Sequence, residues 1–272
     1  MDQARLLLTT LRRRGDGFTG ALDGLTTDLA VAYSLRRLLS SYKGAAIRVR
    51  EDSGNTEADI GFDSDGNLDT TALLAHTGAN SGYVVKWYDQ AGNSRDLAQA
   101  TAVGQPRIVN SGSVDVDAGG LPQMFCNGDG FSVAWEPPSG NISCFCVFSP
   151  TVDTGTQVKL IVSGDDNSAF WIWDESSPSD LNINCGAPSH TLNGVLQTWA
   201  DRPDVYESLV FGNRYLWEAL SLDLSSWPAF QVLGYPTEIT RAQGNLQEFV
   251  VYSSNVTPTP VRSAINDYWG IF

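Results

Sequence analysis

The 272-residue chain has few histidines, no paired-cysteine metal motif and no nucleotide-binding loop. His76 and His190 stand in separate loop-like stretches, and neither lies near a Gly-x-Ser-x-Gly turn, which argues against Ser-His catalysis. The four cysteines show no Cys-x-x-Cys spacing, so we expect no zinc site and four reduced, mostly buried thiols; a disulfide between separate strands is the alternative. No Walker A or GxGxxG motif is present, which leaves nucleotide binding without support.

Long apolar runs are also missing. No segment approaches the roughly 20 apolar residues of a membrane-spanning helix. The stretch "LLLTTLRRR" near the start is too short for a signal peptide, and its charges follow the apolar run instead of preceding it. We therefore expect no membrane contact, and a chain that stays in the compartment where it is made.

Basic residues are scarce outside the N-terminal end. The net charge is −14, yet residues 1–50 carry nine Lys/Arg and four acids, or +5, while the other 222 residues carry −19. An acidic body repels nucleic acid, so we expect no nucleic-acid partner. Arg12, Arg13 and Arg14 mark a docking arm, which contacts either its own chain or an acidic neighbour. The alternative is a set of solvated surface arginines.

The chain has many turn residues and few charged ones: Gly 26, Pro 12 and 18% charged. This composition favours short strands. Residues 29–42 have leucines and alanines at helical spacing and predict a helix, and a separate arm is expected over residues 1–28. From Ala45 the apolar period becomes two, and about a dozen short strands follow. The final stretch, 258–272, predicts a short helix, so residues 29–272 should form one β-sandwich or jelly-roll domain.

Aromatic residues beside acids mark one candidate carbohydrate-binding site. Trp171 and Trp173 are two residues apart, so they share one face of a strand, and Asp174 and Glu175 follow directly. Tryptophan faces with adjacent carboxylates suit a sugar ring; the alternative is that this face is core. No metal or other cofactor is expected. The alternative is a Ca²⁺ site in one of the Asp-rich loops, 63–69 or 165–167, because Ca²⁺ binds several oxygen ligands.

The stretch "KWYDQAGN" predicts a tight structural turn. Asp89 and Asn93 can bond nearby backbone N–H groups, and Gly92 permits a positive φ. Trp87 and Tyr88 are adjacent and point to opposite faces, so one of them should enter the core.

Three of these segments carry a family resemblance. "AYSLRRLLSSYKGAAIRVRED", "GNLDTTALLAHTG" and "VVKWYDQAGNSRDLAQATAVGQPRIV" resemble the N-terminal portion of the α-L-arabinofuranosidase B catalytic domain. Similar segments occur in virion proteins of tailed bacteriophages. The closing stretch, "GNLQEFVVYSSNVTPTPVRSAINDYWGIF", resembles the end of laminin-G-type sandwiches. The resemblance implies an all-β, concanavalin-like sandwich (jelly roll) with an N-terminal helical arm and a short C-terminal helix.

The family's catalytic carboxylates are altered in this chain. Its nucleophile is a Glu in an aromatic-Asp-x-Glu-Asn-Asn run, but here Glu175 directly follows Asp174 and the Asn pair is missing. Its general acid is an Asp after a Gly-Gly pair; here Thr237 takes that place and Glu238 comes one position later. Loss of either carboxyl removes proton transfer that is typically worth about 10²–10⁴-fold. Glu175 and Glu238 are therefore interpreted as vestigial, and no catalytic residue is expected.

Together these features predict a non-catalytic structural or adhesion protein of a phage virion, such as a tail, fibre or capsid-decoration component. It would assemble in the host cytoplasm, bind other virion proteins through its N-terminal arm and form a homo-oligomer such as a trimer. Its lectin-like loops would contact host surface glycans. The alternative is a glycoside hydrolase of the α-L-arabinofuranosidase type, which needs two facing carboxylates.

Overall fold

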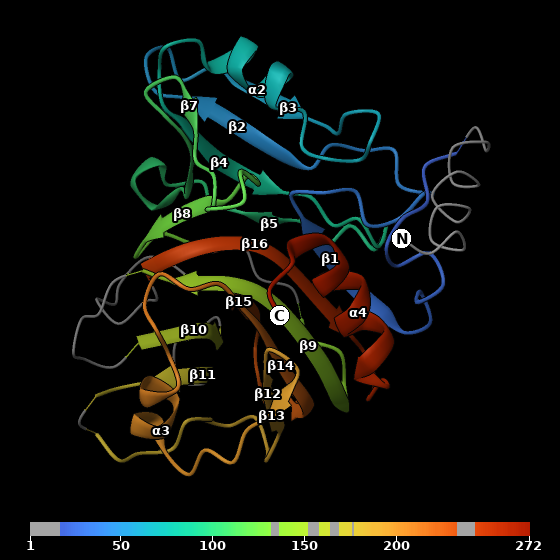
Figure 1. Ribbon diagram of the computed structural model, residues 1–272, viewed down its shortest axis with the longest axis vertical. Helices are drawn as coiled ribbons and strands as arrows, with labels where there is room; N and C mark the ends of the chain where they lie inside the picture. Colours follow the sequence, from blue (N-terminus) through green and yellow to red (C-terminus); the bar gives the residue numbers. More distant parts are fainter. Residues whose placement is uncertain (1–16, 132–135, 152–157, 164–168, 176, 233–242) are drawn as a thin grey trace, which may run out of the picture.

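The computed structural model describes residues 17–131, 136–151, 158–163, 169–175, 177–232 and 243–272. These residues form two antiparallel sheets with three α-helices, so the predicted all-β sandwich is confirmed (Figure 1). None of the described helices is long and apolar enough to cross a membrane. All four cysteines are buried and free, as predicted.

The large sheet has thirteen strands in the order β13-β12-β14-β9-β16-β8-β6-β4-β2-β3, with β1 pairing with β16, β5 with β4 and β7 with β6. Its strands are β1 (Leu29–Ser34), β2 (Ile47–Glu51), β3 (Glu57–Ile60), β4 (Gly82–Trp87), β5 (Leu97–Ala98), β6 (Arg107–Asn110), β7 (Ser113–Val114), β8 (Met124–Asn127), β9 (Asn141–Pro150), β12 (Ser189–Leu192), β13 (Val195–Leu196), β14 (Tyr215–Asp223) and β16 (Gln243–Tyr252).

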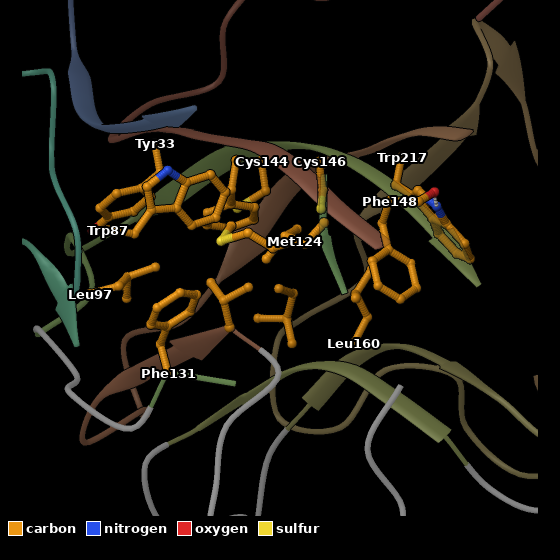
Figure 2. Close-up of a cluster of buried hydrophobic side chains, with 14 of the residues drawn as sticks. Tyr33, Trp87, Leu97, Met124, Phe131, Cys144, Cys146, Phe148, Leu160 and Trp217 are labelled. Atoms are coloured by element: carbon orange, nitrogen blue, oxygen red, sulfur yellow. Dashed lines mark hydrogen bonds between the residues drawn. The ribbon is translucent and has the colours of Figure 1, made fainter. Parts of the chain in front are cut away.

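A second sheet of three strands has the order β11-β10-β15. It consists of β10 (Val158–Ser163), β11 (Ala169–Trp173) and β15 (Phe230–Val232). Its side chains belong to the same core cluster as the inner face of β9, β14 and β16. Figure 2 shows this core, where Phe148 of β9 lies close to Leu160 of β10. The core of the sandwich therefore lies between the two sheets.

The described helices are short. They are α2 (Thr70–Thr77), α3 (Arg202–Glu207) and α4 (Pro258–Trp269), with a 3₁₀ turn η1 (Ala102–Gly104). The predicted C-terminal helix is confirmed as α4: Pro258 begins it, and Gly270 ends it in the left-handed conformation with φ +58°. Val261, Ile265 and Trp269 of α4 pack on the outer face of the central strands.

The predicted helix over residues 29–42 is wrong. Leu29–Ser34 form β1, which pairs antiparallel with the end of β16, Leu29 opposite Tyr252 and Ser34 opposite Glu248. All six residues of β1 are buried, because the core covers one face and α4 and its neighbours cover the other. A strand buried on both faces has no polar alternation, so its apolar positions also fit helical spacing.

The described part of the expected N-terminal arm, residues 17–28, consists of turns that pack on the sandwich. Leu22 is fully buried, and its backbone N–H donates to the Leu38 carbonyl at 3.0 Å. Residues 17–28 therefore belong to the folded body. Arg12, Arg13 and Arg14 lie outside the described residues.

Candidate functional site

The tryptophans of β11 lie in the core of the sandwich. The Trp217 ring of β14 is 6.0 Å from the Trp171 ring and 5.7 Å from the Trp173 ring, measured between centroids. The two β11 tryptophans do share a face, as their spacing predicts, but they are only 1% and 2% exposed. A sugar ring needs an exposed aromatic face to stack on. The geometry therefore fits the alternative, in which this face is core.

Trp171 has an unusual backbone. Its φ is +55°, in the left-handed region, which is an outlier for a bulky residue inside a strand. Its indole Nε1 is buried and has no hydrogen-bond partner among the described residues. A non-glycine residue held in this conformation costs about 1–3 kcal/mol and is most often found at functional sites. The rings of Phe170 and Trp217 lie beside the Trp171 ring, with centroids 4.8 Å and 6.0 Å away.

Acidic residues follow directly where β11 ends. Asp174 is 7% exposed, and its Oδ1 accepts a hydrogen bond from the backbone N–H of Ser177 at 3.1 Å. Glu175, the next residue, is exposed. The strand thus places one carboxylate at the rim of the core and presents the next one to solvent.

Arg202, the first residue of α3, packs beside these acids. It is 8% exposed, and its Nε donates to the Asp180 carbonyl at 2.9 Å. Burial lowers the pKa of its guanidinium, while the carboxylates of Asp174 and Asp180 act in the opposite direction. The end of β11 therefore holds one buried positive charge, on Arg202, close to the negative charges of Asp174 and Asp180.

His190 of β12 lies on the other side of the aromatic cluster. It is buried, not on the surface, and its ring centroid is 5.7 Å from that of Trp199. Nε2 lies 3.1 Å from the side-chain oxygen of Asn182, while Nδ1 has no partner in the described part of the chain. Burial lowers the pKa of His190 to about 4, so the imidazole is neutral at neutral pH.

Sequence reasoning missed Arg202, Trp199 and Trp217. A local signal for the first was present: Asp201 is an N-cap whose carboxylate accepts from the backbone of Asp204, and Pro203 lies in the first turn. This pattern places Arg202 at a helix start. Nothing local indicates that Trp217 meets β11, because that contact forms across the sandwich.

The Asp89 turn lies in a different part of the fold and is built as a corner. The Asp89 carboxylate accepts from the backbone N–H groups of Ala32 at 3.0 Å, Ala91 at 2.9 Å and Asn93 at 3.1 Å. Gly92 has φ +83°, and the Asn93 amide donates to the Ala30 carbonyl at 2.9 Å. Burial raises the pKa of Asp89, against the effect of these hydrogen bonds. The turn fastens β1 to the chain after β4.

Trp87 and Tyr88, beside this turn, point to opposite faces, as predicted. Trp87 is fully buried in the core, and its ring centroid is 5.6 Å from that of Tyr33. Tyr88 points the other way, and its hydroxyl donates to Asp59 Oδ1 at 2.7 Å. The pair holds a corner of the scaffold.

Of the remaining candidates, those that the structure describes give no further site. Glu238 and residues 165–167 lie outside the described residues. In the 63–69 loop, Asp63 Oδ1 accepts from the backbone of Asp65 and Asn67, both at 2.9 Å, which makes a local turn. Within the described ranges, no group of three or more His, Cys, Asp or Glu side chains is arranged to hold a metal ion.

Comparison with known proteins finds a similarity in structure alone. No family model matches the chain, and no curated protein matches its sequence. A GH54 α-L-arabinofuranosidase soaked with a cyclic sulfate inhibitor superposes with a TM-score of 0.56 at 16% identity, over 90% of this chain and 63% of the other. An arabinofuranosidase complexed with arabinofuranosyl-α-1,2-xylobiose gives 0.56 at 15% identity with the same coverage. A Trypanosoma rangeli sialidase in complex with sialic acid gives 0.39 at 10% identity, over 68% of this chain and 31% of the other.

The likeness defines a class of fold. The chain is a β-sandwich of the kind found in GH54 arabinofuranosidases and spans about 63% of the length of those proteins. The resemblance to the arabinofuranosidase B sandwich is confirmed at the level of fold. The prediction of a phage virion structural protein, with its tail and capsid-decoration roles, is wrong, because these structural neighbours are glycoside hydrolases.

Proposed function

We propose that this chain is a glycoside hydrolase of the α-L-arabinofuranosidase type, with Glu175, which the sequence pattern led us to interpret as vestigial, as a reacting carboxylate. One observation carries the proposal: the strained Trp171 and its aromatic neighbours hold the end of β11, and this strand end presents a fixed Asp174 and an exposed Glu175. The likeness to arabinofuranosidases over 90% of the chain supports the choice of substrate class.

The chemistry assigns different tasks to the neighbouring acids. Asp174 is held by the Ser177 backbone and lies within the field of Arg202, so it keeps the strand end and its charge in place. Glu175 is exposed and can approach a sugar from solvent. Glycoside hydrolysis needs a second carboxyl to protonate the departing oxygen while the bond to the anomeric carbon breaks. Glu238, outside the described residues, is the second candidate that the sequence offers.

The test is release of nitrophenolate from 4-nitrophenyl α-L-arabinofuranoside by the full chain. We expect turnover by the native protein and a loss of about 10²–10⁴-fold in kcat in Glu175→Gln, because the isosteric amide cannot act as a nucleophile or proton carrier. Glu238→Gln should cause a similar loss. Glu57→Gln, on the exposed face of β3, is the matched control and should keep native activity.

Circular dichroism of each variant separates a lost reaction from a lost fold. Absence of turnover by the native chain, or full activity in Glu175→Gln, would contradict the proposal.

A further inference from the structure

A small hollow lies on the outer face of the large sheet, opposite the aromatic core. Ser149 of β9 and Asn245 of β16 are paired across the two strands and line it; each adjoins a residue of the core cluster, so their own side chains point outward. The 116–119 loop and the 212–214 turn also line the hollow, which has a volume of about 300 Å³. This volume is at the lower end of the range for small-molecule sites, which suits a ligand the size of one sugar ring.

A mostly buried ion pair joins the two segments beside the hollow. Arg214, in the turn, forms this ion pair with Asp117, in the loop, and also donates to the Trp269 carbonyl at the end of α4. Asp117 Oδ1 accepts from the backbone N–H of Gly119 at 2.8 Å, and Oδ2 accepts from the side-chain amide of Gln247 at 3.0 Å. Gln247 is only 1% exposed. The hollow is therefore held in one shape before a ligand enters, which lowers the entropic cost of binding.

The charges that line the hollow cancel each other. Within the described ranges, Asp117 and Arg214 are its two charged lining residues, and their side chains are only 10% and 19% exposed. Each already has the other as its countercharge, so a charged ligand would displace one of them or enter without a partner. The hollow therefore favours an uncharged ligand.

Groups that can still bond a ligand surround this ion pair. The side-chain amides of Asn213 and Asn245 have no hydrogen-bond partner in the part of the chain that the structure describes. The Gln123 amide donates to the Val116 carbonyl at 3.0 Å, and the Ser149 hydroxyl donates to the Asn213 carbonyl at 2.9 Å, so the oxygen of each side chain can still accept. Val116, which is 46% exposed, adds an apolar surface.

An uncharged ligand with many hydroxyl groups matches this arrangement, because each hydroxyl can both donate and accept. We propose that the hollow binds one uncharged sugar residue, with its hydroxyl groups between Asn213 and Asn245 and its C–H surface on Val116. The hollow shares no residue with the end of β11, so this binding is separate from the proposed hydrolysis. Only the choice of pentose probes rests on that proposed function.

Titration of the ¹⁵N-labelled full chain with D-xylose and, separately, with xylobiose tests the site. The backbone amide signals of Gly119 and Gly212, which line the hollow, should shift and saturate in the millimolar range, as expected for a ligand of about ten non-hydrogen atoms. A response to xylobiose alone supports the site and identifies a unit within a chain as its ligand, whereas a response to both sugars identifies a single ring. No saturable shift at either glycine would overturn the proposal.

The same titration in variants tests the two free amides. Asn213→Ala/Asn245→Ala should weaken the binding by about ten-fold or more, because the ligand loses both amides. Asn141→Ala, at the exposed start of β9, removes an asparagine outside the hollow and should keep native binding. Circular dichroism confirms that each variant is folded. Unchanged binding in the double variant would overturn the proposal.

A charged sugar tests the preference for an uncharged ligand. D-glucuronate has the ring of D-xylose with a carboxylate added, and it should shift the Gly119 and Gly212 signals several-fold less. A saturable shift with D-glucuronate as large as that with D-xylose would contradict the proposal. Release of nitrophenolate without any shift at the two glycines would remove this site and leave the proposed hydrolysis; shifts without release would remove the hydrolysis alone.

Discussion

The central strands β9, β14 and β16 bury very different chemistry on their two faces. On the outer face, under α4, Glu248 of β16 and Glu218 of β14 are completely buried, and each accepts two hydrogen bonds from one arginine. On the inner face the same strands carry Trp217, Phe249 and buried cysteines against the three-stranded sheet (Figure 2). On these three strands, the buried charged side chains lie on the outer face only.

The difference shows how this fold separates structural acids from acids that can react. Glu248 accepts bonds from Arg36, Ser34 and the Trp269 indole, so its acceptor capacity is used by the scaffold. The side chains that β9, β14 and β16 present on the inner face are aromatic, aliphatic or thiol groups, and no carboxylate lies among them. Near this face, Asp174 and Glu175 directly follow the end of β11, and Glu175 is exposed to solvent. The buried Glu248 therefore has a structural role. The exposed Glu175, next to the aromatic core, is the candidate for a reacting carboxylate.

The strongest test of this contrast is Arg36→Met. The change leaves Glu248 buried without its countercharge, and we expect the free energy of unfolding to fall by about 3–5 kcal/mol in urea denaturation. Arg48→Met breaks the exposed pair with Asp59, whose side chains are 38% and 45% exposed, and should cost no more than about 1 kcal/mol. Equal losses in the two variants would remove the distinction between buried and exposed pairs.

Arg262→Met tests the second outer-face pair. Glu218 is fully buried, but the Arg262 side chain is 21% exposed, so water can partly replace the guanidinium. We expect a loss of about 2–3 kcal/mol at pH 7.5. Burial already raises the pKa of Glu218, and removal of the cation raises it further. A group with a raised pKa in the folded state takes up a proton on folding, so the loss should shrink as the pH falls toward 5. A loss that does not change with pH would contradict this account.

His190→Gln examines the rim of the inner face. Burial lowers the pKa of His190 to about 4, from about 6.5 in the unfolded chain, so the unfolded state binds the proton first. Its stability contribution is complete above pH 6.5 and is lost as the pH falls toward 4. Between pH 7.5 and 5 this one group should cost about 2 kcal/mol, and His190→Gln should remove that slope from urea unfolding curves. His76→Gln, the change of the other histidine, serves as control and should retain the slope.

The smallest expected effect concerns the end of α4. Gly270 has φ +58°, and its N–H donates to the Asn266 carbonyl at 2.8 Å. Gly270→Ala should cost about 1 kcal/mol, because a Cβ disfavours the left-handed conformation. Ser263→Ala, at an exposed position in the same helix, should change the melting temperature by less than Gly270→Ala does. A larger effect of Ser263→Ala than of Gly270→Ala would mean that the end of α4 can adopt another backbone conformation without a cost in stability.

The sequence predicted the fold well wherever one face of an element meets water. In β2, Ile47 and Val49 are buried while Arg48 and Arg50 are half-buried, so the period of two is visible. Pro258 and Gly270 likewise mark the two ends of α4. The pattern failed at β1, since burial of both faces removes the alternation that separates a strand from a helix.

The candidate site was predictable only in part. The spacing of Trp171 and Trp173 fixes that they share a face, but which face is buried depends on Trp217, more than forty residues later in the chain. The left-handed backbone of Trp171 could not be predicted, because a bulky residue rarely adopts a positive φ. Asp89 was predictable, since an Asp-x-x-Gly-Asn turn satisfies its own backbone locally.

The pairing of β1 with β16 has a consequence for biosynthesis. Strands from opposite ends of the sequence are neighbours, and β16 also bridges β8 and β9 near the middle of the large sheet. A nascent chain still lacking residues 243–252 has no strand to join these parts. The sandwich therefore closes only after residues 243–252 have left the ribosome, and until then its unpaired strand edges are surfaces that chaperones can recognise.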